Sequence, residues 1–128
     1  MDIKDFEAGQ LAYVRLTGNA SRGRSGNELI EEWEIVSVGR KLIKAKRKGF
    51  SDIHAVTFEQ KGGGYNGRFV EKTDSCVNYV IYANKKELDD EIESEELLNF
   101  ITAYFQGFRR NISLESLRTI AALIKETQ

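Results

Sequence analysis

The side chains that most often carry catalysis are scarce in this sequence. It has one histidine, His54, and one cysteine, Cys76. We expect His54 to lie on a strand as a structural or surface residue rather than a general base. Cys76 opens an apolar strand without a nearby basic residue to form a thiolate, so we expect it to serve packing. One histidine and one cysteine cannot form a Cys/His zinc site or a disulfide framework. The sequence therefore predicts a protein that is not an enzyme and has no metal or cofactor.

Carboxylates are concentrated between residues 87 and 96. A catalytic acid–base pair needs burial to separate its pKa values, and this polar run gives no sign of burial. On a helix the run instead forms a solvated acidic face. Such a face can mimic phosphate charge and occupy the cationic groove of another protein. The candidate partner-binding residues are Asp89, Asp90, Glu93 and Glu96.

The main basic feature lies between residues 40 and 48. Three of its lysines alternate along the chain and therefore share one face of a strand, an arrangement suited to phosphates. Trp33, Phe50 or Tyr65 could supply stacking. The alternative is an edge strand that lysines protect from aggregation, or a basic strand covered by the acidic helix. With two arginines of the loop between residues 17 and 27, the candidate nucleic-acid-binding residues are Arg22, Arg24, Arg40, Lys44, Lys46 and Lys48.

A second glycine-rich loop, residues 61–67, does not match a phosphate-binding loop. It lacks the Gly-Lys-Ser/Thr ending of that motif, and no helix follows it. We therefore interpret it as a flexible hairpin connection.

Length, composition and charge fit a single globular domain. The chain has 128 residues, of which 41% are hydrophobic and 30% charged, with a net charge of -1. That balance excludes a strongly basic or polyacidic tail. Neither a membrane-spanning apolar run nor the apolar core of a signal peptide is present, so we expect a cytoplasmic protein without membrane contact. The small net charge conceals two unlike parts, because residues 1–84 carry +2 and residues 85–128 carry -3.

The first part predicts strands. Runs of β-forming residues separated by glycine and asparagine occupy residues 11–16, 33–38, 41–47, 53–59, 68–71 and 76–82. Five or six short antiparallel strands favour a small closed barrel, because closure removes exposed edges. A flat sheet covered by helices is the lesser alternative. Gly39-Arg40 is typical of a type II′ hairpin turn between the second and third strands.

The second part predicts two or three helices. Asn84 is a suitable N-cap. At about 100° per residue, Leu88 lies nearly opposite the apolar face around Phe100. A straight helix cannot bury both against one surface, so we expect either a break near residues 93–94, which we favour, or a helix between two partners. A final helix after Ser113 carries an apolar stripe, which we expect to pack on the Phe100 face. If that face stays uncovered, the candidate protein interface, or homo-oligomer contact, contains Phe105 and Phe108.

Together these patterns predict an α+β protein. An antiparallel barrel spans residues 1–84, and a helical extension, residues 85–128, packs on it as one compact unit. The runs Phe6–Val14 and Glu34–Lys41, with Tyr82 and Lys85–Glu87, resemble small SH3-like β-barrel proteins of Firmicutes and their phages. The resemblance implies an SH3-like barrel, whose long first loop often binds partners, and a phage or mobile-element setting. It implies no reaction, and no functional residue is carried over.

Two functions follow as hypotheses. The first is a non-enzymatic accessory protein that acts by protein–protein contact on a host nucleic-acid-binding or defence protein, for example as an inhibitor. The second is a nucleic-acid-binding module that uses the basic strand and loop.

Overall fold

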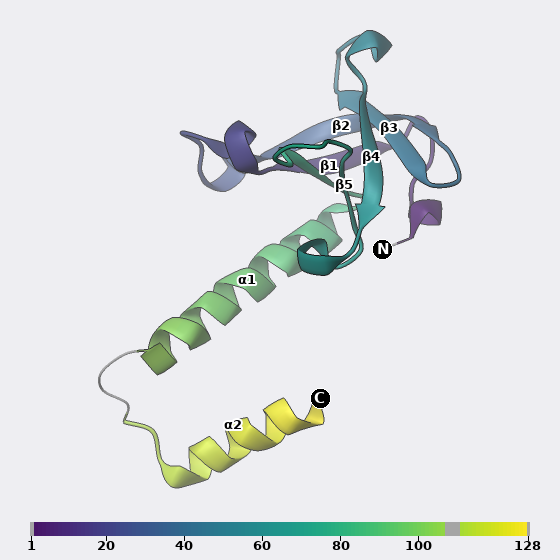
Figure 1. The fold of residues 1–128 in the computed structure, drawn as a ribbon. Coiled ribbons are helices and arrows are strands. Elements are labelled where there is room, and N and C mark those ends of the chain that lie inside the picture. Colours follow the sequence, from purple (N-terminus) through teal and green to yellow (C-terminus); the bar gives the residue numbers. More distant parts are fainter. Residues whose placement is uncertain (1, 107–110, 128) are drawn as a thin grey trace. The chain divides into compact units, whose positions relative to one another are not determined.

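The computed structural model describes residues 2–106 and 111–127. The chain divides into two compact units, Met1–Glu91 and Ile92–Gln128. The strands of the first unit are β1 (Leu11–Leu16), β2 (Ile30–Val38), β3 (Leu42–Arg47), β4 (Val56–Lys61), β5 (Arg68–Glu71) and β6 (Tyr79–Tyr82). Each strand pairs antiparallel with the next, and β6 pairs with β1, so the barrel is closed (Figure 1). The predicted α+β architecture with an antiparallel barrel is confirmed, and the flat sheet is wrong.

Inward-facing side chains of the strands fill the barrel. Alternate residues of β1 and β3 are buried, as the period of two in a strand requires. The buried ring of Trp33 meets Phe58 edge to face, with 5.9 Å between ring centroids. Phe6 closes the core from outside the strands and makes a similar contact with Phe69 at 5.5 Å. The barrel therefore has a complete aromatic and aliphatic core of its own.

Two connections differ from expectation. Residues 52–54 form a 3₁₀ turn, which the Ser51 side chain caps by accepting the N–H of Ile53, so β4 begins at Val56 and not at Ile53. This turn stands away from the barrel wall at the top of Figure 1. The predicted β2–β3 hairpin is confirmed, but Gly39 lacks the positive φ that the first central position of a type II′ turn requires.

The helices are α1 (Lys85–Gln106) and α2 (Leu114–Glu126), and the structure shows no other α-helix in residues 2–106 and 111–127. The Asn84 side chain accepts the N–H of Glu87, which confirms the predicted cap. The expected break near residues 93–94 is wrong, because α1 is continuous. Its sequence contains neither glycine nor proline and consists mainly of good helix formers. No helix among the described residues is both long and apolar enough to span a membrane.

Candidate functional site

The two side chains best suited to catalysis, His54 and Cys76, are both exposed and do not lie in a buried, charged site. His54 is exposed in the 3₁₀ turn, so its expected strand position is wrong, and its ring contacts Phe50. Cys76 is exposed in the connection before β6, so it does not pack as expected. Within the described parts of the chain, no group of three or more His, Cys, Asp or Glu side chains could hold a metal ion.

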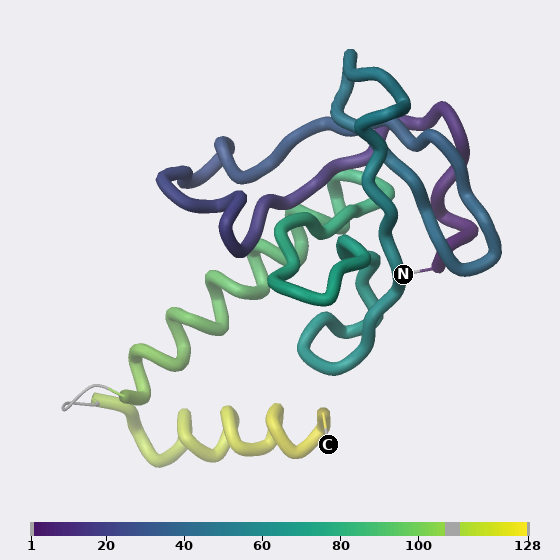
Figure 2. Tube along the Cα trace, turned by 45° about the horizontal axis from the view of Figure 1, so that its top comes forward, coloured from purple at the N-terminus to yellow at the C-terminus, as the bar shows by residue number. Residues whose placement is uncertain are grey.

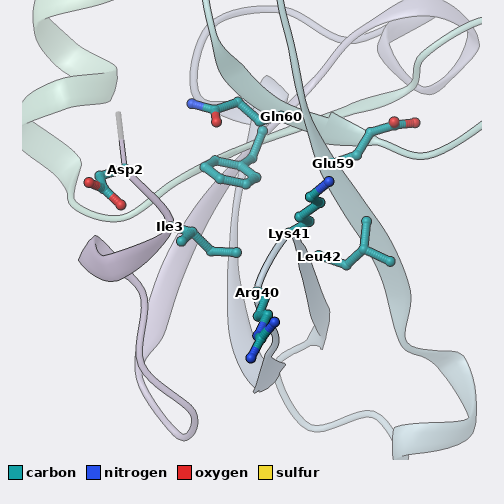
Figure 3. A pocket seen from close by; sticks show the side chains of 8 residues that line it. Asp2, Ile3, Arg40, Lys41, Leu42, Glu59 and Gln60 are labelled. Carbon is teal, nitrogen blue, oxygen red and sulfur yellow. The ribbon is translucent and has the colours of Figure 1, made fainter.

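A pocket of about 560 Å³ lies between the N-terminal turn, the β2–β3 connection and strands β4 and β5 (Figure 3). Figures 1 and 2 show the N-terminal segment beside the β2–β3 connection. Its size suits a small ligand. Its walls mix apolar, cationic, anionic and amide groups: Asp2, Ile3, Arg40, Lys41, Leu42, Glu59, Gln60 and Phe69. Because none of its charged side chains is buried, the pocket shows no preference for one class of ligand.

Lys44 and Lys46 lie on β3, whereas Lys48 follows the end of that strand, so only two of the three predicted lysines share a strand. Lys44 is exposed between two buried residues of β3, and Lys46, which follows the second of these, is half-buried. Lys46 bonds to Asp52 at 2.7 Å, and this hydrogen bond raises the pKa of Lys46. Lys48 lies 3.7 Å from a carboxylate oxygen of Glu32. Acidic neighbours therefore offset two of the three lysines. The edge-strand alternative is wrong, because β3 pairs with both β2 and β4.

The loop between β1 and β2 is tied to the chain before β6. The Thr17 hydroxyl donates to the carbonyl of Val77, and the N–H of Asn19 donates to the Asn78 side chain. These bonds hold the 3₁₀ turn Gly18–Ser21 in place, and a second 3₁₀ turn, Gly26–Leu29, follows in the same loop. Arg22 and Arg24 are both exposed on this loop.

Glu31 joins the loop to the basic strand, an arrangement that the sequence patterns did not predict. Its carboxylate accepts the indole N–H of Trp33 and the Nε–H of Arg47, both at 3.1 Å, and lies 3.6 Å from Arg24. The Arg47 guanidinium also lies over the rings of Trp33 and Tyr79, at 5.9 and 6.0 Å. Because Trp33 is 2% exposed, it cannot stack on a nucleic-acid base.

Phe50, the second stacking candidate, is 48% exposed beside His54. The third candidate, Tyr65, contacts Lys61 through its ring at 5.5 Å. The contacts of Glu31 could have been found from the strand register, because that register places Trp33 opposite Arg47.

The acidic face of α1 is partly neutralised. Asp89 pairs with Lys85 at 3.2 Å, and Asp90 pairs with Lys86 at 2.7 Å. These lysines stand four residues earlier on the same helix, where opposite charges attract. Glu93 and Glu96 are exposed and have no ion-pair partner in the described part of the chain. Two of the four carboxylates of the predicted phosphate mimic are therefore neutralised by lysines of the same helix.

Nine of the thirteen large hydrophobic residues that are exposed in the described part of the chain lie on the two helices. Leu88 is fully buried, and no described residue after it is buried. The expected mutual burial of α2 and the Phe100 face is therefore not observed. Phe105 is partly exposed and contacts Tyr104, whereas Phe108 lies outside the described residues. The exposed large side chains are Leu97, Leu98, Phe100, Ile101, Tyr104, Leu114, Leu117, Leu123 and Ile124. We call the described residues of segment 92–126 the helical surface.

Comparisons with models of known protein families, with curated proteins and with solved structures give no significant match.

Proposed function

We propose that the chain is a non-enzymatic protein-binding protein. The barrel is its stable platform, and the helical surface binds a partner that presents apolar helices of its own. The observation that carries this proposal is the exposure of nine large apolar side chains on two helices, while the barrel core is already complete. Exposed patches of this extent mark interaction sites.

The phase of α1 explains why the chain leaves these side chains uncovered. Leu88 is buried, whereas Leu97, which lies directly opposite at about 180° around the helix, is 53% exposed. At about 100° per residue, a straight helix cannot turn both toward one surface. Because α1 continues without a break, the apolar face opposite Leu88 can be buried only against a surface other than the one that buries Leu88. Apolar helix faces pack best against other helices, ridges into grooves.

The SH3-like identity of the barrel, the biological setting and the target also belong to this proposal. The sequence resemblance supports an SH3-like barrel and an accessory role in a phage or mobile element. A host protein as the final target rests on the same resemblance and on the carboxylate of Glu96, which has no ion-pair partner among the described residues.

Photo-cross-linking tests the proposal. A benzophenone amino acid replaces Phe100 in the full chain, and a matched control replaces Ile53, which is 84% exposed on the barrel. Both variants are irradiated as purified protein and in a lysate of the cells that encode the chain. We expect a discrete protein adduct from position 100 that position 53 does not give. Equal adducts from both positions, or none from position 100, would overturn the proposal.

Nucleic-acid binding is the second candidate. In its favour, the cations of Arg22, Arg40 and Lys44 have no acidic partner in residues 2–106 and 111–127. If they bind phosphates, affinity for a labelled single-stranded oligonucleotide falls steeply as salt rises. Lys44→Gln should then weaken binding, while Lys46→Gln, whose lysine is already paired, should change it less. Absence of binding at low salt would exclude this function.

A further inference from the structure

We infer that the partner of the helical surface is a second copy of this chain. The inference rests on the proposed function and names its partner. In it, α1 of each copy packs parallel to α2 of the other, so that two copies form a four-helix bundle around a twofold axis.

The charges beside the apolar stripe of α2 favour a parallel neighbour. Leu114, Leu117 and Ile124, all exposed, fall on heptad positions a, d and d. Arg118 then falls on position e, and it has no ion-pair partner in the described part of the chain. In parallel helix pairs, e faces g of the partner, so α2 fits a helix with an acid at g.

Helix α1 supplies that acid. Leu97 and Tyr104 fall on d and Ile101 on a, and all three are exposed. Glu93 then falls on g and, like Arg118, lacks an ion-pair partner in the described part of the chain. The two helices therefore carry complementary charges beside complementary apolar stripes.

One register satisfies both the apolar and the charged positions. With α1 parallel to α2 of the second copy, Glu93 meets Arg118 as a g–e pair. The same register aligns the apolar core pairs Leu97 with Leu117, Ile101 with Ala121, and Tyr104 with Ile124.

The chain's own α2 does not provide this match. A short connection makes neighbouring helices antiparallel, and in antiparallel pairs g faces g and e faces e. Glu93 and Arg118 would then lie on opposite sides of the contact. A twofold axis perpendicular to the helices, with each chain's own two helices diagonal in the bundle, places each α1 beside and parallel to the other copy's α2.

The apolar area available is close to what a dimer needs. Nine large side chains of the helical surface are exposed. Leu123 lies off the stripe of α2, and covering the other eight removes roughly 50 Å² of apolar surface each, so one chain contributes on the order of 400 Å². A typical stable interface buries about 800 Å² per partner, of which somewhat more than half is apolar.

Sedimentation equilibrium of the full chain tests the inference through charge reversal. We expect a dimer, which Glu93→Arg and Arg118→Glu each weaken about tenfold, because each variant places like charges together. An equimolar mixture of the two variants should recover the dimer, since each contact then joins opposite charges. Glu95→Arg is the matched control, because position 95 lies away from the stripe, and it should leave the dimer unchanged.

Failure of this inference differs from failure of the proposed function. A monomer at all concentrations, or a dimer that neither reversal weakens, would overturn the second copy as partner. If position 100 then cross-links to a different protein in the lysate, protein binding still stands. If it cross-links to nothing, both proposals fall.

Discussion

Glu31 joins three polar partners on one side of the barrel. Its carboxylate accepts a hydrogen bond from the indole N–H of Trp33 and forms ion pairs with the guanidinium groups of Arg47 and Arg24. It is only 26% exposed, so water cannot fully replace it as a partner. The same contacts neutralise two of the cations that the basic surface would otherwise present to phosphate.

Replacing Glu31 by Gln should lower the free energy of unfolding by about 1–2 kcal/mol, because two charge-assisted contacts lose their anion. Urea denaturation followed by the fluorescence of Trp33 measures the change. Glu32→Gln is the control, since Glu32 is more exposed and its one ion pair with a described residue is to Lys48 at 3.7 Å. It should change the same quantity by less than about 0.5 kcal/mol. Equal losses in the two variants would contradict the role given to Glu31.

Tyr82 links the last strand to the start of α1. Burial raises the pKa of its phenol above the ordinary value, and a hydrogen bond with Glu91 raises it further. The Arg68 guanidinium lies 5.4 Å from the ring and 3.3 Å from the Glu91 carboxylate. The folded protein thus favours the neutral phenol.

This shift predicts a loss of stability in alkali. Below the unfolded pKa of about 10 the phenol is neutral in both states and its stabilisation is complete. As the pH rises above that value, the unfolded chain ionises first, so the free energy of unfolding should fall by about 1.4 kcal/mol per pH unit from this group. Tyr82→Phe should remove that part of the slope in denaturation measured between pH 9 and 11. An unchanged slope would show that Tyr82 is not the group responsible.

At the scale of elements, Gly18 allows the first loop to approach the chain before β6. It has a φ of +52°, and a Cβ there would lie 2.6 Å from the Cys76 sulfur and 2.7 Å from the Val77 carbonyl oxygen. Backbone atoms cannot yield as a flexible side chain can. The close approach is what positions Arg22 and Arg24 on an ordered loop.

Gly18→Ala should therefore destabilise the barrel by about 2–4 kcal/mol, combining backbone strain with overpacking. Gly23→Ala is the control, because Gly23 also has a positive φ but nothing lies within 4 Å of its Cβ position. Its cost should be limited to about 1–2 kcal/mol. Thermal denaturation compares the two, and equal costs would contradict the proposed contact.

The buried start of α1 and the exposed surface of α2 should differ in their effect on stability. Leu88 is fully buried, and Leu88→Ala should lower the free energy of unfolding by about 2–4 kcal/mol. Leu123→Ala removes the same atoms from an exposed position off the stripe of α2, and should cost less than about 0.5 kcal/mol. Denaturation at low protein concentration, monitored by Trp33, separates them. Similar costs would mean that the helical surface contributes to the fold of the single chain.

At the scale of the whole molecule, the sequence patterns predicted those features that depend on residues close together in the chain, such as strand alternation and helix caps. The alternation of Ile43 and Ala45 with lysines placed β3 correctly, and Asn84 and Ser113 cap the helices as predicted. The break in α1 was wrong because it assumed that one chain must bury every apolar face, whereas helix propensity favours continuation.

Other features depend on residues distant in the sequence. The pairing of Lys46 with Asp52 and of Arg47 with Glu31 follows from turn geometry and strand register, so the counted lysines overstated the positive surface. The exposure of His54 likewise follows from a capped 3₁₀ turn that alternation could not reveal.

The barrel core is complete in one chain, and we propose that the helical surface is buried only when two copies associate. Hydrogen–deuterium exchange of the intact protein, at concentrations well below and well above its self-association, tests this most directly. We predict that amides of residues 97–106 and 114–124 become protected only at the higher concentration, while those of β2 and β3 exchange equally slowly at both. Full protection of α2 at the lower concentration, where the chain sediments as a monomer, would contradict the account.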